Sequence, residues 1–210
     1  MSTSSSRPPF LRSLSTNSVI RPSKHKPRLY IVLYPRGGST TTSSFRNDIN
    51  CDSHHWSLVV GSQSPNRKDP GTRYHVEHLD HDAGKYLYDQ QDVPTHPSAQ
   101  AGLVRIAIAK VTNEARLQSI LRDIVVPQED VGFNCLTWVR DAFVRLHQDR
   151  KSIRTYLDDT DWPAVETCAR KYCKRKKDVG RFQEDRRRPG TWNPEKISTF
   201  NFWENRETCP

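Results

Sequence analysis

The chain has 210 residues, 34% of them hydrophobic, with a net charge of +9 at pH 7 and a mean hydropathy of −0.82. This length predicts one domain, and the low mean hydropathy predicts polar ends around a compact core. No apolar run approaches the length of a bilayer crossing, so no membrane span is expected.

Strand and helix patterns alternate with turn signals along the chain. Residues 1–27, rich in Ser and Pro, predict a disordered basic tail. Period-two alternation and β-forming residues predict strands at 28–34, 55–61, 73–79, 85–89 and 103–111. Apolar residues at helical spacing predict helices at 113–122, 135–147 and 162–175. Residues 178–210 predict a basic and aromatic C-terminal tail.

These elements predict an α+β fold. We expect a single domain over residues 28–177, in which an antiparallel sheet of about five strands packs against three helices. Charge follows the same division: residues 1–47 carry +8 and residues 170–190 carry +7 against a total of +9, so the rest of the chain carries −6. The basic character therefore belongs to the ends and not to the core.

Five cysteines stand at positions 51, 135, 168, 173 and 209. Their number is odd, no apolar signal segment precedes them and no Cys-x-x-Cys pair occurs, which predicts reduced thiols in the cytoplasm or nucleus. Mitochondrial import is the alternative, because the N-terminal segment is Ser-rich, contains Arg and lacks acids. Pro8 and Pro9 oppose it by breaking any early helix.

Three side chains indicate thiol chemistry. Asn134 predicts the N-cap of the helix that begins at Cys135, where the positive end of the helix dipole favours a thiolate. The turn-rich residues 62–72 predict a hairpin that places His55 and His75 on one face of adjacent strands. A helix on that face would bring Cys135 to one of the two imidazoles, which would take the thiol proton. The other imidazole would hold the first in the correct tautomer. The alternative for Cys135 is a small buried core residue.

Two other patterns suggest different functions. His75, His78 and His81, with nearby acids, have the ligand chemistry for zinc, although 75 and 78 would face opposite sides of a strand. The basic run Lys171–Lys177 is typical of a nuclear-import signal or a nucleic-acid contact, and equally of a solvated helix end. We expect no metal in the Cys135 site and no cofactor.

The motifs His55-Trp56, Tyr74-His75 and Asn134-Cys135 resemble the circularly permuted papain-like superfamily, most closely its lecithin:retinol acyltransferase-like group. Residues 28–175 are also similar to small fungal proteins of uncharacterised function that share a His-Trp strand, a Gly-x-Arg-Tyr-His strand and an Asn-Cys-x-x-Trp-Val helix. The first resemblance implies a permuted papain-like fold.

The same resemblance assigns roles to residues. It implies Cys135 as nucleophile, His55 as general base and His75 as the orienting third member, with Asn134 and the Cys135 N–H at the oxyanion position. The implied activity is a thiol hydrolase or acyltransferase acting on the amide, ester or thioester of an acyl or peptide substrate. The alternative is a non-catalytic module on the same fold that binds a protein partner or, through its basic ends, nucleic acid.

Overall fold

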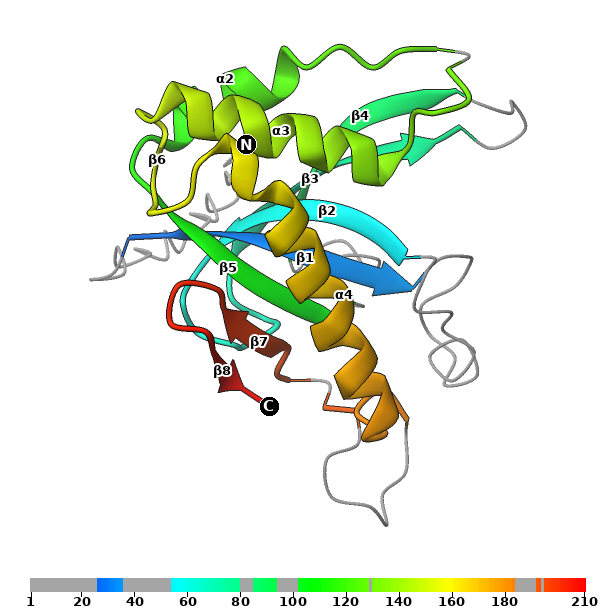
Figure 1. Ribbon diagram of the computed structural model, residues 1–210, viewed down its shortest axis with the longest axis vertical. Helices are drawn as coiled ribbons and strands as arrows, with labels where there is room; N and C mark the ends of the chain where they lie inside the picture. The colour runs from blue at the N-terminus through cyan, green and yellow to red at the C-terminus, as the bar shows by residue number, and fades with distance from the viewer. Residues whose placement is uncertain are drawn as a thin grey trace, which may run out of the picture.

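One mixed sheet organises the molecule (Figure 1). The computed structural model describes residues 26–35, 54–79, 85–93, 102–128, 130–183, 192–193 and 195–210. In these residues the strands are β1 (Arg28–Pro35), β2 (His54–Gly61), β3 (Gly71–His78), β4 (Tyr86–Val93), β5 (Val104–Val111), β6 (Ile153–Arg154), β7 (Ser198–Asn201) and β8 (Arg206–Cys209). The helices are α2 (Glu114–Arg122), α3 (Cys135–Asp149) and α4 (Trp162–Asp178), with a 3-10 turn η2 (Asp159–Asp161).

The strand order is β4-β3-β2-β1-β5-β7-β8, and β6 pairs with β5. All neighbours are antiparallel except β5 and β7, which run parallel. The predicted α+β class is confirmed, but the sheet has eight described strands and not about five. The added strands are the short β6, β7 and β8, and one of their pairings is parallel.

The C-terminal segment is part of the domain wherever the structure describes it. Residues 195–210 contain β7 and β8, so the prediction of a tail from 178 onward is wrong for them. Phe200 in β7 lies opposite Ile106 of β5 and its ring packs 5.3 Å from that of Tyr172 in α4. Glu207 in β8 accepts the Tyr172 hydroxyl at 2.5 Å and pairs with Lys176. Residues 1–25, the bulk of the predicted N-terminal tail, lie outside the described residues.

The helices lie on one face of the sheet. Figure 1 shows α3 and α4 in front of the strands, α3 against β2 and β3 and α4 against β1 and β5. The strand side chains that alternate toward this face, such as Trp56, Leu58 and Tyr74, join the helices in the main buried core. A smaller cluster that includes Tyr30, Val32 and Tyr34 covers part of the opposite face.

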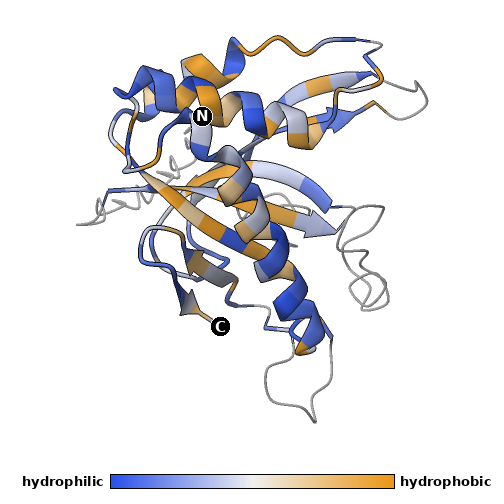
Figure 2. Cartoon of the chain, viewed as in Figure 1, coloured by the Kyte–Doolittle hydropathy of each residue, from blue (hydrophilic) through white to orange (hydrophobic). Residues whose placement is uncertain are grey.

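The basic run of α4 is partly neutralised within the fold. Lys176 is buried and pairs with Glu207, and Lys174 lies 2.8 Å from Asp178 one helical turn on. Figure 2 shows that this end of α4 is hydrophilic. Cations there also complement the helix dipole. Within the described residues, the helices lack the combination of length and apolar character that crossing a bilayer requires.

Asp149 joins α3 to two other elements. Its carboxylate accepts a hydrogen bond from Arg116 Nε in α2 (2.7 Å) and one from the Ser152 N–H ahead of β6 (2.8 Å). Mainly through Arg116, these bonds hold the pKa of Asp149 well below its ordinary value of 3.8. A carboxyl group of this kind stabilises the fold above its unfolded pKa, and that contribution is lost as the pH falls through its lower folded pKa.

We therefore expect Asp149→Asn to lower the free energy of unfolding at neutral pH and to have a progressively smaller effect below the unfolded pKa of 3.8. Urea unfolding of the variant and the wild type at neutral and acidic pH measures the difference. Asp141→Asn is the control: the Asp141 side chain is half exposed and pairs at 3.5 Å with the exposed Arg140, so the change is expected to have little effect at either pH. A pH-independent loss in Asp149→Asn would contradict the assignment.

Candidate active site

A complete N-cap fixes the first turn of α3. Asn134 Oδ1 accepts hydrogen bonds from the backbone N–H groups of Leu136 (2.9 Å) and Thr137 (3.2 Å), and the Asn134 N–H donates to Thr137 Oγ1 (2.8 Å). This capping box makes Cys135 the first residue of the helix. The thiol is therefore held at the end of α3 where backbone dipoles favour a negative charge.

The Cys135 thiol contacts the backbone of β2. The Trp56 N–H donates to Sγ at 3.5 Å, and Sγ lies 3.9 Å from the carbonyl oxygen of His54. These two groups flank His55 on one edge of the strand, because the C=O of a residue and the N–H two positions on point the same way. The sulfur thus occupies a place beside His55 that a neighbouring strand would otherwise take.

β2 and β3 pair along only half of their length. Their register runs from Gly61–Gly71 to Leu58–Tyr74, whereas β3 and β4 pair over all eight positions. Beyond Leu58 the two strands are joined through side chains: Nε2 of His55 lies 3.0 Å from Nδ1 of His75, with the ring planes at 86°. The cysteine enters β2 in this same segment.

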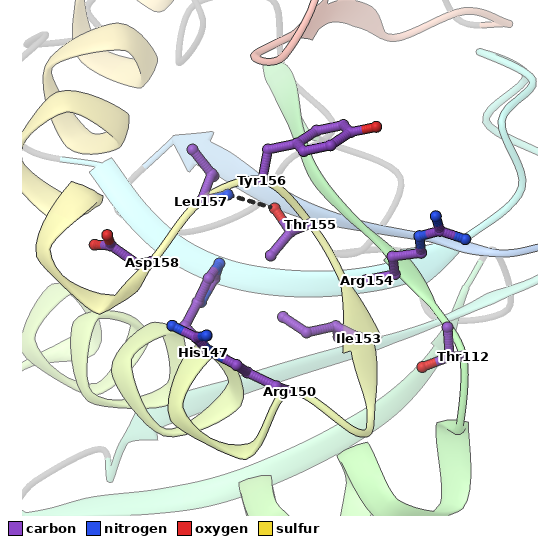
Figure 3. Close-up of a pocket in the computed structure, with 9 residues that line it drawn as sticks. All are labelled: Thr112, His147, Arg150, Ile153, Arg154, Thr155, Tyr156, Leu157 and Asp158. Carbon is purple, nitrogen blue, oxygen red and sulfur yellow. Dashed lines mark hydrogen bonds between the residues drawn. The ribbon is translucent and has the colours of Figure 1, made fainter.

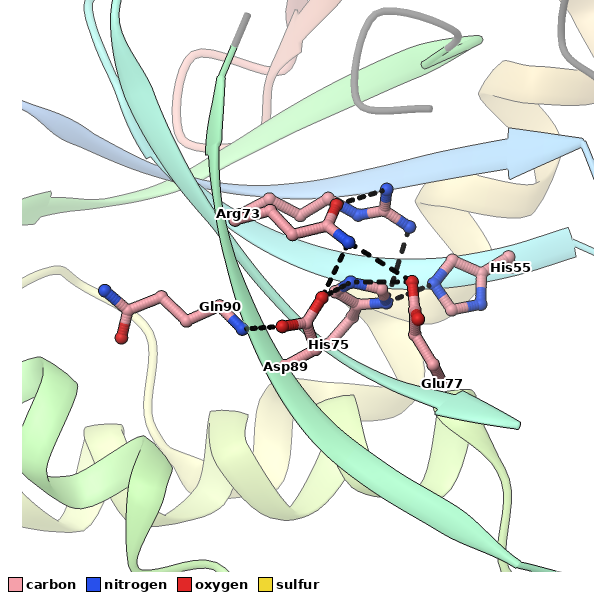
Figure 4. Close-up of polar contacts among 7 residues, drawn as sticks. His55, Arg73, His75, Glu77, Asp89 and Gln90 are labelled. Carbon is pink, nitrogen blue, oxygen red and sulfur yellow. Dashed lines mark hydrogen bonds and ion pairs between the residues drawn. The ribbon is translucent and has the colours of Figure 1, made fainter. Parts of the chain in front are cut away.

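The polar partners of His75 fix the tautomers of both histidines (Figure 4). Arg73 Nη2, which can only donate, lies 3.4 Å from His75 Nδ1, so Nδ1 is an acceptor. His75 Nε2 therefore carries the hydrogen, and it lies 3.4 Å from Asp89 Oδ2 and 3.5 Å from Glu77 Oε1. Because His75 Nδ1 accepts, His55 Nε2 must donate, which leaves the lone pair of the His55 ring on Nδ1.

Gln91 holds the two carboxylates in place. Its amide nitrogen lies 2.6 Å from Asp89 Oδ2 and 3.3 Å from Glu77 Oε1, and its oxygen accepts from Arg73 Nη1 at 3.4 Å. The Arg73 guanidinium is buried and stacks 4.2 Å above the Tyr34 ring. The contacts of Gln91 with Arg73 and with the two carboxylates agree in direction with the histidine tautomers.

The positions of the predicted residues can now be compared with expectation. His55 and His75 lie on one face of neighbouring strands, as the 62–72 hairpin predicted. However, α3 packs on the opposite face, with Trp56 and Leu58. Cys135 instead meets β2 at its edge, next to His55, and is 3% exposed.

A contact between a different thiol and a different imidazole was not predicted. His54 points into the helix-covered core, where its Nε2 lies 3.3 Å from Sγ of Cys173 in α4. Cys173 is in the interior of α4 and fully buried, so it lacks the helix-terminal position of Cys135. Tandem histidines on a strand point to opposite faces, and this alternation was the available signal for separating the roles of His54 and His55.

The acidic and basic partners of His75 were also missed. Arg73, His75 and Glu77 alternate along β3, so the sequence could have placed them on one face. Asp89 joins them only through the β3–β4 register, in which it lies opposite His75. The strand predicted to end at Asp89 continues to Val93 because the polar residues beyond it still pair with β3.

A metal could be held at a different set of residues from the predicted one. Ligand atoms of His75, Glu77 and Asp89 lie within 4.8 Å of one another. Of the predicted ligands, His78 is exposed and packs against Tyr86, while residues 80–82 with His81 lie outside the described residues. The donors fit a divalent cation by type, but the network above already assigns His75 Nε2–H to these carboxylates.

Fold and site together define an α+β protein in which a cysteine at a helix N-terminus contacts the backbone of the strand that carries His55, and His55 pairs with a histidine backed by carboxylates. The model of a family of unknown function, DUF6914, matches residues 26–209, and the chain belongs to this family. No curated protein and no solved structure matches the chain.

Asn134 offers a test that separates stability from reactivity. Asn134→Ala removes the cap of α3 and is expected to lower the free energy of unfolding by about 1 kcal/mol. Asn113→Ala is the matched control, because Asn113 caps α2 through a 3.0 Å bond to the Arg116 N–H. Both variants are expected to lose similar stability in urea unfolding, and only Asn134→Ala to slow alkylation of Cys135. Equal alkylation rates in the two would show that the cap has no role at the thiol.

Proposed function

We propose that the protein is a thiol hydrolase or acyltransferase in which Cys135 is the nucleophile, His55 the general base and His75 the residue that orients it. One observation carries the proposal: the hydrogen-bond directions leave the acceptor of the His55 ring on Nδ1. Nδ1 is the ring nitrogen nearer the backbone, and Cys135 Sγ lies against the backbone on both sides of His55.

The reaction follows from these positions. His55 Nδ1 accepts the thiol proton, and the sulfur attacks the carbonyl carbon of an amide, ester or thioester. The oxyanion that forms accepts a hydrogen bond from the Cys135 N–H at the helix N-terminus. The intermediate collapses as its bond to the leaving group breaks, and the imidazolium of His55 returns the proton to that group. Water or another acceptor then attacks the acyl-cysteine, with His55 as base, and frees the thiol.

The carboxylates behind His75 support the charged intermediate. When His55 becomes an imidazolium, its Nε2–H still donates to His75 Nδ1, and Asp89 and Glu77 lie 3.4 and 3.5 Å from the far nitrogen of His75. A neutral imidazole between a cation and a carboxylate passes on the stabilisation without changing its own tautomer. The buried Arg73 selects that tautomer before the reaction begins.

Cys135 is a better candidate than Cys173, the other thiol beside a histidine. Cys135 is at the capped N-terminal end of a helix and its sulfur receives the Trp56 N–H, whereas Cys173 lies inside α4. The order of the chain, with the histidine strands before the cysteine helix, is also that of the permuted papain-like resemblance. That fold assignment is part of the same proposal.

An acyl adduct on Cys135 is the direct test. The protein is incubated with p-nitrophenyl acetate, and peptides are mapped by mass spectrometry after rapid quenching. We expect one acetyl group on Cys135, none in Cys135→Ala, and release of p-nitrophenol that the same variant abolishes. An unmodified Cys135, or equal acetylation of several thiols, would overturn the enzyme and leave the non-catalytic binding module.

Asp89→Asn tests the second layer of the site. The change removes the negative charge next to His75 Nε2 and is expected to lower the rate of p-nitrophenol release by about 10–100-fold, with the protein still folded. Asp92→Asn, an exposed position on the same strand, is the control and should leave the rate within about twofold. If both variants react at the wild-type rate, the carboxylate has no part in the chemistry.

A further inference from the structure

His75, Glu77 and Asp89 converge on one face of the β3–β4 pair (Figure 4). His75 and Glu77 alternate along β3, and Asp89 lies opposite His75 in β4. One ligand atom from each of the three lies within 4.8 Å of the other two, and the described part of the chain has no second group of this kind. The imidazole is buried, whereas the side chains of Glu77 and Asp89 are 51% and 37% exposed. The group is therefore open to solvent on its carboxylate side.

The spacing of these ligand atoms matches a tetrahedral metal ion. His75 Nε2 lies 3.4 Å from Asp89 Oδ2 and 3.5 Å from Glu77 Oε1. Both distances exceed the length of an ordinary N–H···O hydrogen bond, which is about 2.9 Å. Zinc binds imidazole nitrogen and carboxylate oxygen at about 2.0–2.2 Å, so tetrahedral geometry separates its ligand atoms by about 3.3–3.6 Å. The two measured distances lie within that interval.

Gln91 supplies the outer hydrogen bonds that a metal site requires. Its amide nitrogen lies 2.6 Å from Asp89 Oδ2 and 3.3 Å from Glu77 Oε1, and its oxygen accepts from Arg73 Nη1. Such outer contacts orient the carboxylates that ligate a metal. Two carboxylates also balance the charge of a divalent ion. The imidazole ligand favours zinc over magnesium and calcium, which prefer oxygen ligands throughout.

A metal on His75 and the present tautomer of His75 exclude each other. A metal needs the lone pair of Nε2, but Nε2 now carries the hydrogen because Nδ1 accepts from His55 and Arg73. A metal-bound imidazole has its hydrogen on the other nitrogen and donates it to a neighbour. With the metal bound, His75 Nδ1–H therefore donates to His55 Nε2, and the hydrogen of the His55 ring is on Nδ1. Arg73 gives up a long contact of 3.4 Å and keeps its bond to Gln91.

We propose that His75, Glu77 and Asp89 bind a zinc ion, and that its binding reverses the tautomers of His75 and His55. Water takes the fourth ligand position. The proton on His75 Nε2 leaves to solvent, the hydrogen between the rings passes from His55 Nε2 to His75 Nδ1, and His55 Nδ1 takes one proton from water. No net proton is gained or lost.

Inhibition of the reaction at Cys135 is the consequence of this reversal. Once His55 Nδ1 carries a hydrogen, it no longer accepts the thiol proton. This consequence alone rests on the proposed function, because the zinc site and the reversal of the tautomers are defined by the geometry of the two strands.

Zinc binding to the reduced full chain is measured by competition with a chromophoric chelator, and the tautomers by the ¹⁵N signals of the histidine rings with and without zinc. We expect saturable binding, with the protonated nitrogen moving from Nε2 to Nδ1 in both His75 and His55. Glu77→Gln and Asp89→Asn should each weaken binding at least about tenfold, because loss of an outer contact alone typically costs about 10–100-fold.

The pocket at the C-terminal end of α3 provides a matched control (Figure 3). It contains another imidazole and another carboxylate, those of His147 and Asp158, and His147 Nε2 is buried with no hydrogen-bond partner among the described residues. The described residues do not complete this pair to a group of three ligands. Asp158→Asn should therefore bind zinc like the wild type. Cys135→Ala should as well, because the thiol is not a ligand.

Binding that Glu77→Gln and Asp89→Asn leave unchanged, or that Cys135→Ala or Asp158→Asn abolishes, would overturn the zinc site. Binding with both histidine tautomers unchanged would overturn the reversal. A folded chain that shows no saturable binding would overturn both.

Release of p-nitrophenol separates this proposal from the proposed function. The wild type is expected to lose activity as zinc saturates the site and to regain it with EDTA, and Glu77→Gln to need at least about tenfold more zinc for half inhibition. Full activity in the zinc-saturated protein would refute inhibition. Lack of release from the metal-free protein would refute the proposed function instead, while binding and tautomers still decide the zinc site.

Discussion

Replacing His55 with alanine is expected to slow p-nitrophenol release at Cys135 by about 10²–10⁴-fold, the usual contribution of a positioned general base. The loss is large because the 3.0 Å contact with His75 leaves the acceptor of the His55 ring on Nδ1, and Cys135 Sγ contacts the backbone on both sides of His55. Without it, the thiol proton must go to water and no group returns a proton to the leaving group. Stopped-flow absorbance under single-turnover conditions measures the acylation step itself.

Two histidine variants make this prediction specific. His78→Ala, an exposed histidine at the end of β3, should react at nearly the wild-type rate. His75→Ala is expected to lie between the two, because it removes the orienting partner but leaves the base. If His54→Ala loses much more activity than His55→Ala, the reacting thiol is Cys173 beside His54, and our assignment of Cys135 fails.

The largest effect on stability is expected from Phe143→Ala, a loss of about 3–5 kcal/mol. Phe143 is fully buried at the centre of the contact between α3 and α4. Its ring stacks on His147 with centroids 3.8 Å apart and packs 5.5 Å from Trp162, which in turn lies 6.3 Å from Trp56. Removing it leaves a cavity that these aromatic rings are too constrained to fill, and urea unfolding measures the loss of free energy.

Val131→Ala is the control for this change. Val131 is 100% exposed, so its substitution should alter the free energy of unfolding by less than about 0.5 kcal/mol. A loss below about 1 kcal/mol in Phe143→Ala would mean that α3 and α4 do not pack as described. Because Trp56 follows His55 directly, we also expect Phe143→Ala to slow the reaction at Cys135 in the fraction that remains folded.

Much of the fold could be predicted because it depends on local patterns. The five predicted strands and three helices all occur, with ends shifted by up to four residues, and Asn113 and Asn134 are the caps of α2 and α3. These elements have long apolar periodicity or an explicit capping residue. By contrast, β7 and β8 have four residues each and follow a polar segment, so no periodicity could identify them. The parallel pairing of β7 with β5 depends on tertiary packing alone.

In the candidate site, too, some features could be predicted from the sequence and others depend on how the strands and helices pack. The contact between His55 and His75 follows from a hairpin and from the alternation of side chains between the two faces of a strand, and the sequence predicts both. The role of Asp89 depends on the register of β4, a strand whose polar residues have low β propensity. The face covered by α3 could not be predicted either, because a shift of one residue in β2 would exchange His54 and His55 between the two sides of the sheet.

The rate of alkylation of each cysteine at neutral pH tests the central claim most directly. Iodoacetamide labelling for increasing times, followed by peptide mass spectrometry, gives one rate for each thiol. Cys168 is the internal reference, since burial raises the pKa of its thiol and favours slow reaction. We predict that Cys135 is alkylated fastest, despite its 3% exposure, and that His55→Ala removes this advantage. Reaction of Cys135 at the rate of Cys168, unchanged in His55→Ala, would contradict a thiol activated by imidazole.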